Sequence, residues 1–155
     1  MEPTSEQVQQ FQIQQRARNG SNWFYWIAGL SLVTSIVHLT GSQWGFIASL
    51  GITQVFDGIG ATMGAGGKTV AMILDLFAAV AFIGLGYFAR RHTAAWIIGM
   101  SLYALDSLIF VWIQEWIGIA FHAFVLFSIF SGFKAFKQLM PPQPAGEPRP
   151  EPIQP

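Results

Sequence analysis

The sequence predicts an all-α integral membrane protein, a bundle of four transmembrane helices with an additional short amphipathic or re-entrant helix on the outer side. Of its 155 residues, 52% are hydrophobic and only 10% are charged, whereas soluble domains carry about 25% charged residues. The apolar residues also gather in stretches close to the roughly 20 residues that a helix needs to cross a hydrocarbon core. Most of the surface is therefore expected to face lipid.

The composition also excludes several function classes. Lysine plus arginine and aspartate plus glutamate balance at 8 each, so no basic excess is present for binding the phosphates of nucleic acid. Cysteine is absent, which excludes disulfides, thiolate metal sites and a cysteine nucleophile. Because no serine elbow or other recognisable catalytic motif is present either, we expect no enzymatic activity.

Residues 1–22 form a polar, glutamine-rich N-terminal tail, which we expect to be cytoplasmic. Thr4 and Gln7 have the spacing of a capping box. A short helix is expected from about Ser5 to Arg18, and its thin apolar face predicts a solvated or loosely interfacial segment.

The transmembrane bundle is expected to occupy residues 23–137. Its spans are predicted at residues 23–41, 69–89, 94–113 and 116–136. The first span opens with an aromatic cluster typical of the membrane interface. Only Gln114 and Glu115 separate the last two spans, so these must form a tight antiparallel hairpin.

Cationic residues predict the orientation of the bundle. With four spans, three pairs of cations fall on the same side of the membrane: Arg16 with Arg18, Arg90 with Arg91, and Lys134 with Lys137. Short cytoplasmic segments carry an excess of lysine and arginine. Both termini are therefore expected in the cytoplasm, and the protein in a plasma or inner membrane.

Residues 44–59 are apolar but too short for a comfortable span. Their apolar side chains follow helical spacing on one face, with polar side chains on the other. We interpret this segment as a helix lying in the outer interface or entering the membrane as a re-entrant element. The alternative is a fifth span, which would move the last two cationic pairs to the outer side. Gly58 to Gly67 is expected to be a flexible connection.

Residues 138–155 form a proline-rich C-terminal tail. Such a composition favours extended polyproline II conformations and cannot form a packed core. We expect a disordered cytoplasmic tail, and the alternative is a docking ligand for a cytoplasmic partner.

Several polar residues lie inside the predicted spans at similar depth: His38, Asp75, Asp106 and His122. Tyr103 shares a helix face with Asp106. A carboxylate at the centre of a membrane helix costs roughly 2.5 to 3.5 kcal/mol on insertion scales, so it is tolerated mainly where it faces protein or trapped water. These residues are therefore the candidate intramembrane polar cluster.

Three interpretations of this cluster remain open. The first is a non-enzymatic structural or accessory subunit held together by interhelical hydrogen bonds, each about 0.6 kcal/mol in membranes. The second is proton- or cation-coupled transport, or a proton relay, through Asp75, Asp106, His38 and His122. The third is a bound metal or haem, although no H-x-x-x-H spacing is present. We assign no cofactor, and we expect the bilayer, further copies of the chain or a larger membrane complex as partners.

Overall fold

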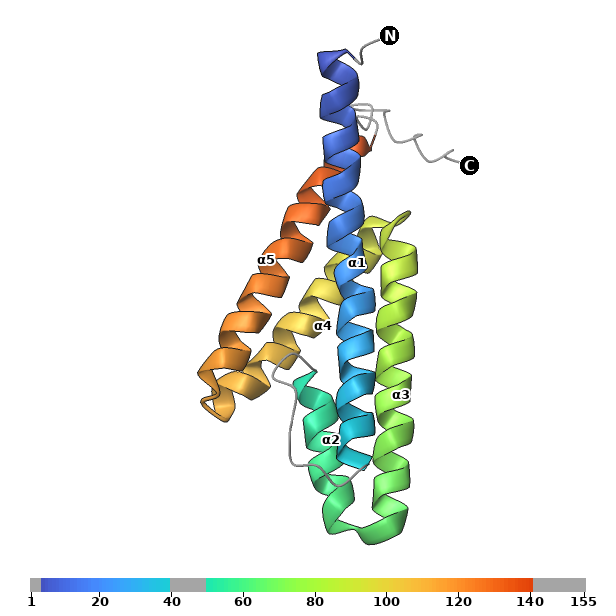
Figure 1. Cartoon of the computed structure of the whole chain (residues 1–155), viewed down its shortest axis with the longest axis vertical. Coiled ribbons are helices and arrows are strands. Elements are labelled where there is room, and N and C mark those ends of the chain that lie inside the picture. The colour runs from blue at the N-terminus through green and yellow to red at the C-terminus, as the bar shows by residue number, and fades with distance from the viewer. Residues whose placement is uncertain (1–3, 40–49, 141–155) are drawn as a thin grey trace, which may run out of the picture.

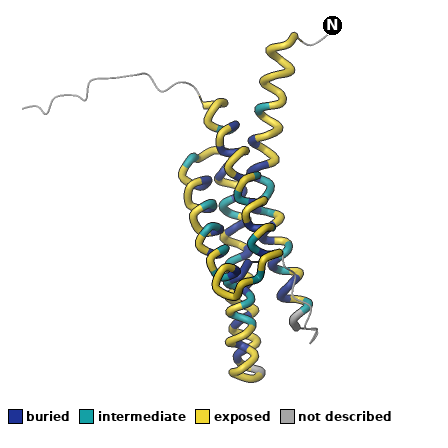
Figure 2. The backbone as a smooth tube through the Cα atoms, turned by 90° about the vertical axis from the view of Figure 1, so that its left-hand side faces the viewer, coloured by how far each residue is buried: buried dark blue, intermediate teal, exposed yellow. Residues whose placement is uncertain are grey.

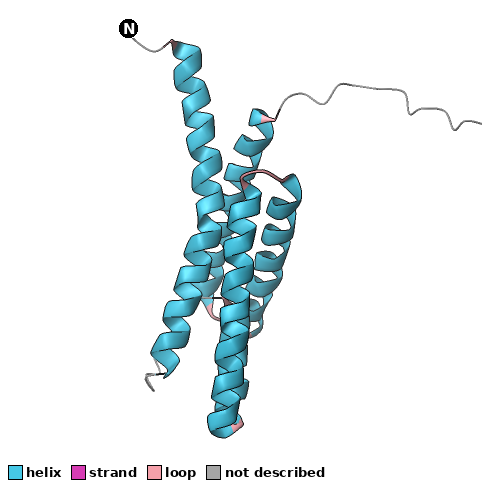
Figure 3. Ribbon diagram, turned by 90° about the vertical axis from the view of Figure 1, so that its right-hand side faces the viewer, coloured by secondary structure: helices cyan, strands magenta, loops and turns pink. Residues whose placement is uncertain are grey.

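A computed structural model describes residues 4–39 and 50–140 of the chain. It contains the helices α1 (Ser5–Leu39), α2 (Gly51–Thr62), α3 (Gly64–Ala89), α4 (Thr93–Trp112) and α5 (Trp116–Leu139). No strand occurs in these two ranges (Figures 1 and 3). Three stretches are long and apolar enough to cross a membrane, namely Gly66–Ala89, Thr93–Trp112 and Trp116–Leu139. The predicted all-α class and membrane character are therefore confirmed.

Burial follows the pattern of a protein surrounded by lipid. Large apolar side chains cover the outside of the helices, as for Phe77, Trp112 and Phe127, which are 73%, 88% and 71% exposed. Figure 2 shows exposed residues along the outer face of every helix and buried residues where helices meet. Several polar side chains are buried instead: Ser31, Thr34, Ser35, Thr53, Asp75, Asp106 and His122. Polar side chains are thus buried between the helices while apolar side chains face outward, as expected for helices surrounded by lipid.

Helix α1 is continuous over 35 residues, so the prediction of a separate short helix before the first span is wrong. The predicted capping box at its start is confirmed: the Thr4 amide donates to Gln7 Oε1 at 3.0 Å and the Gln7 amide to Thr4 Oγ1 at 3.4 Å. At about 1.5 Å per residue, α1 is roughly 50 Å long, against about 30 Å of hydrocarbon. Its N-terminal part extends beyond the other helices (Figure 1).

The C-terminal half of α1 corresponds to the predicted span 23–41, of which residues 40 and 41 lie outside the described ranges. Ser31, Thr34 and Ser35 interrupt its apolar sequence, and all three are buried. Helix α1 packs against both α3 and α5. The three polar residues that lower the hydropathy of α1 therefore contact protein and not lipid.

The connection between α2 and α3 differs from the prediction. The predicted amphipathic segment 44–59 begins with residues outside the described ranges, and the helix runs from Gly51 to Thr62. Only Met63 separates it from α3, so the flexible connection predicted from Gly58 to Gly67 is wrong. A Cβ atom on Gly60 would lie 2.7 Å from the carbonyl oxygen of Gly67. The glycine-rich segment is therefore helical and does not form a loop. Its glycines allow the antiparallel helices α2 and α3 to touch.

The predicted α4–α5 hairpin is confirmed. Gln114 adopts a left-handed conformation with φ 57°, which ends α4 and reverses the chain. Glu115 then caps α5, since its Oε2 accepts a hydrogen bond from the Gly118 amide at 3.0 Å. Figure 1 shows α4 and α5 crossing the molecule obliquely, with α2 between this hairpin and α3.

Helices α1 and α5 approach most closely at a pair of glycines. A Cβ atom on Gly20 would lie 2.5 Å from the Cα of Gly132 and 3.1 Å from the Trp96 ring. Small residues at such crossings bring backbones together, which is how membrane helices pack without a hydrophobic driving force.

We expect Gly20→Ala to lower the free energy of unfolding by about 1 to 3 kcal/mol, because the added methyl group must push α5 away. Titration with sodium dodecyl sulfate in mixed micelles, followed by circular dichroism, measures this change. Gly29→Ala is the matched control on the same helix. A Cβ atom there meets nothing within 4 Å, so the control should be neutral or stabilising by roughly 0.5 to 1 kcal/mol. Equal destabilisation by both substitutions would contradict the glycine contact.

Candidate functional site

Asp106 in α4 caps the N-terminus of α2. Its side chain is almost fully buried, and the residue as a whole is 7% exposed. Its Oδ2 accepts a hydrogen bond from the Gly51 amide and its Oδ1 one from the Ile52 amide, each at 2.8 Å. The first amides of a helix have no partner within the helix, and Leu50, at the N-cap position, has no side chain that could accept from them. A carboxylate from another helix therefore performs the capping.

A serine of α1 completes this cap. The Leu50 amide donates to Ser31 Oγ at 3.1 Å, so three successive amides of the chain are satisfied by side chains of α1 and α4. In return, Thr53 Oγ1 donates to the Leu50 carbonyl at 2.7 Å. A negative charge at a helix N-terminus is also favoured by the helix dipole. The start of α2 is thus held by both hydrogen bonds and charge.

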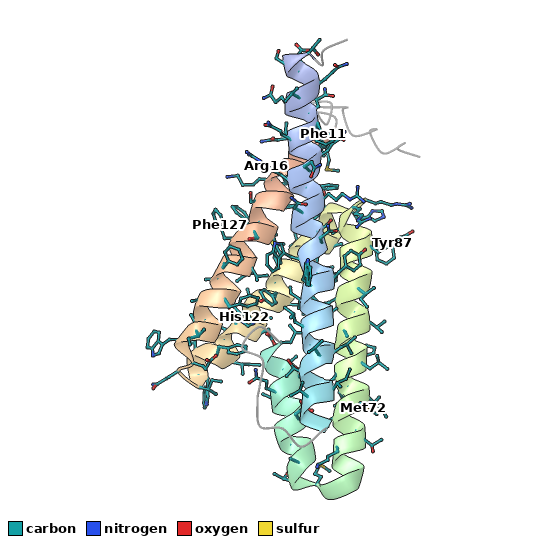
Figure 4. All side chains as sticks on the ribbon, viewed as in Figure 1. Phe11, Arg16, Met72, Tyr87, His122 and Phe127 are labelled. Carbon is teal, nitrogen blue, oxygen red and sulfur yellow. The ribbon has the colours of Figure 1, made fainter. Side chains whose placement is uncertain are left out.

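His122 in α5 lies on the other side of the Asp106 carboxylate. Figure 4 shows it on the face of α5 that is turned towards the rest of the bundle. His122 Nδ1 lies 2.8 Å from the Gly118 carbonyl, and Nε2 lies 3.3 Å from Asp106 Oδ2. A carbonyl only accepts, so Nδ1 carries a proton.

The Asp106 carboxyl group thus has three neighbours. Its Oδ2 lies near the Gly51 amide and His122 Nε2, and its Oδ1 accepts from the Ile52 amide.

Aromatic rings surround the His122 imidazole. Tyr103 stacks on it with centroids 4.7 Å apart and an interplanar angle of 14°, and the Phe110 ring centroid lies 4.3 Å away. The Tyr103 hydroxyl is buried and has no hydrogen-bond partner in the described part of the chain. Tyr103 thus contacts the cluster through its ring on His122.

Asp75 in α3 faces α1. Ser35 Oγ lies 2.6 Å from Asp75 Oδ2 and 3.1 Å from the Ser31 carbonyl oxygen. Asp75 is 1% exposed. Among the candidate residues, His122 contacts both Asp106 and Tyr103, whereas Asp75 is connected to them through the serines of α1 and the start of α2. His38 lies in the last turn of α1, and its side chain is outside the described part of the structure.

These groups form a layer that includes every helix. We call it the polar layer, and it consists of the side chains of Ser31, Ser35, Asp75, Asp106 and His122 with the amides of Leu50, Gly51 and Ile52. Asp106 lies six residues before the end of α4 and His122 six residues after the start of α5. At about 1.5 Å per residue, both lie roughly 9 Å from the hairpin turn, so they meet at equal depth.

The sequence-based prediction missed the partners that satisfy the carboxylates. The partners of Asp106 include backbone amides, which have no signature in the sequence. One signal was present: α2 starts with Leu50 and Gly51, without a serine, threonine, aspartate or asparagine at the N-cap. A helix expected in the membrane without a local cap needs an acceptor from elsewhere. Helical spacing also places Ser31 and Ser35 one turn apart on a single face.

The described residues contain no group of three His, Cys, Asp or Glu side chains that could hold a metal ion. Asp106 and His122 together offer two ligands, and both are engaged in hydrogen bonds. No protein-family model, curated protein or solved structure matches this chain.

We expect Asp106→Asn to release the N-terminal turn of α2. Asparagine keeps one acceptor oxygen, but its NH₂ group would face the second amide, which leaves one buried donor unpaired. Hydrogen bonds to charged groups contribute about 1.5 to 3 kcal/mol. Hydrogen exchange measured by mass spectrometry should therefore be faster by about tenfold or more in peptides that cover α2, and unchanged in the middle of α3.

Ser107→Ala is the matched control, because Ser107 neighbours Asp106 but its hydroxyl donates at 2.6 Å to Ala104 of its own helix. It should leave exchange in α2 unaltered. If Asp106→Asn changed exchange no more than Ser107→Ala does, the trans cap would not hold α2.

Proposed function

We propose that this chain is a non-enzymatic structural or accessory membrane protein whose polar layer fixes a short helix within a helical bundle. The observation that carries the proposal is the set of partners around Asp106. Both of its oxygens accept from backbone amides of α2, and Oδ2 also contacts His122. A carboxylate whose oxygens are engaged in this way stabilises the fold. It has little capacity left to bind and release a ligand.

The geometry favours this role over the proton relay. A relay needs side chains or water that can both take up and release protons. The hydrogen bonds that join Ser31 of α1 to Asp106 among the described residues run instead through the amides of Leu50 and Gly51. Backbone amides donate hydrogen bonds but keep their protons at neutral pH, so these links support a fixed network.

The proposal includes four membrane spans with α2 as a re-entrant helix. Helices α3, α4 and α5 each have the length and hydropathy of a span, and α1 packs against both α3 and α5. If these two cross the bilayer, the C-terminal half of α1 lies in the same slab. Helix α2 begins inside the bundle, where Asp106 caps it, and turns directly into α3. Both termini and the α3–α4 turn then lie on the cytoplasmic side.

The proposal also concerns partners. A bundle without a transport pathway acts by binding lipid, further copies of itself or other membrane subunits, and the broad apolar exterior provides the surface for these contacts.

A flux assay separates the structural role from the relay. We expect purified protein in proteoliposomes to show the same passive proton and cation flux as empty liposomes under an imposed pH gradient. His122→Gln and Asp106→Asn should lower the unfolding midpoint in detergent without changing this flux. A gradient-dependent flux that is present in the unmodified chain and lost in Asp106→Asn would support the relay and refute the structural proposal.

Cysteine labelling tests the topology, because the chain contains no cysteine of its own. A Cβ atom added at Gly66, near the start of α3, would meet nothing within 4 Å, and His92 in the α3–α4 turn is exposed. In intact cells, a membrane-impermeant maleimide should label Gly66→Cys from outside and should label His92→Cys only after permeabilisation. Labelling of both positions from one side would show that α3 does not cross the membrane.

A further inference from the structure

A group of cations gathers at the end of the bundle where α3 and α5 end. It comprises Arg16 and Arg18 of α1, Arg90 and Arg91 after α3, and Lys134 and Lys137 of α5. Within the described ranges, none of these six cations forms an ion pair with a carboxylate. The positive charges at this end are therefore available to an anionic partner.

Two of the arginines line a cavity of about 410 Å³. Arg18 contributes from α1 and Arg90 from the C-terminal end of α3, and the apolar lining includes Trp96, Phe136, Leu139 and Met140. The cavity thus combines two guanidinium groups with an apolar wall, and no acidic residue lines it.

Contacts within the bundle position one of these guanidinium groups. Arg90 Nη2 donates to Asn22 Oδ1 at 3.1 Å, and its Cζ lies 5.6 Å from the centroid of the Tyr25 ring. Neither contact removes its charge. Arg18 has no side-chain hydrogen bond or ion pair to any other described residue. One cation is therefore held in place while the other can adapt to a ligand.

We propose that this cavity binds the phosphate group of an anionic phospholipid. Arginine binds phosphate oxygens in bidentate fashion, and basic pockets between membrane helices on the cytoplasmic side recognise anionic lipid headgroups. The exposed side chains of Leu139 and Met140, together with Phe136, form an apolar wall that provides a surface for the glycerol and the first methylene groups. A free phosphate ion would leave that wall uncovered, so the lipid is the ligand that fits both halves of the cavity.

Native mass spectrometry of the full chain in a neutral maltoside detergent tests the proposal. Phosphatidylglycerol is added and compared with phosphatidylcholine and with inorganic phosphate. We expect one retained phosphatidylglycerol molecule that raises the thermal unfolding midpoint, with binding at least about tenfold tighter than that of phosphatidylcholine. Equal binding of both lipids, or equal stabilisation by inorganic phosphate, would refute a site for an anionic lipid.

The double variant Arg18→Gln with Arg90→Gln should weaken phosphatidylglycerol binding by about tenfold or more, since each basic residue near the surface contributes to this attraction. Arg91→Gln with Lys137→Gln is the charge-matched control: it removes two cations from the same end, and neither lines the cavity. The control should keep binding within about twofold. Equal losses in both double variants would show a diffuse electrostatic attraction and not a site.

Arg18→Glu provides a second test if loss of the Arg90 contacts weakens the fold. This substitution reverses a charge that makes no contact needed by the bundle, so circular dichroism and the unfolding midpoint without lipid should be unchanged. Phosphatidylglycerol retention should fall by about tenfold or more. Full retention of the lipid in this folded variant would contradict the proposed site.

Discussion

The contact between the Asp106 carboxylate and the first amides of α2 is the interaction on which the bundle depends. A helix that begins among other membrane helices cannot have its first amides solvated, and each unsatisfied backbone group in hydrocarbon costs several kcal/mol. A buried carboxylate without donors is equally unfavourable. Here the amides provide the donors that the carboxylate needs, and the carboxylate provides the acceptors that the amides need, because both carboxylate oxygens accept from the amides at 2.8 Å. Neither α2 nor Asp106 would be stable in this place alone.

The surrounding residues extend that contact to the whole molecule. His122 brings α5 to the carboxylate, and Ser31 and Ser35 bring α1 to the start of α2 and to Asp75 of α3. Near the middle of α1, Gly20 meets Gly132 of α5, where backbone contact replaces hydrogen bonds. Helix α1 is therefore held at two levels by different means, polar near its C-terminus and steric near the cationic end.

Local sequence was sufficient to predict α3, α4 and α5 to within a few residues, because hydropathy and length alone define a span. It was insufficient for the N-terminal half of α1, whose thin apolar face gave no reason to expect a helix continuous with the span. The direct turn from α2 into α3 was missed since glycines suggest flexibility until a partner helix is known. Within the candidate site, equal depth suggested that Asp106 and His122 meet, and they lie 3.3 Å apart. The amides of Gly51 and Ile52 could not be foreseen, because every residue carries such groups and only the tertiary fold selects these two.

The cap also bears on how the protein is made. Synthesis begins at the N-terminus, and Gly51 precedes Asp106 by 55 positions, so α2 leaves the ribosome well before its acceptor does. During that interval the leading amides of α2 lack the acceptor that holds them in the folded protein. The cap of α2 forms only once α4 has been made, and the contact of Asp106 with His122 follows with α5.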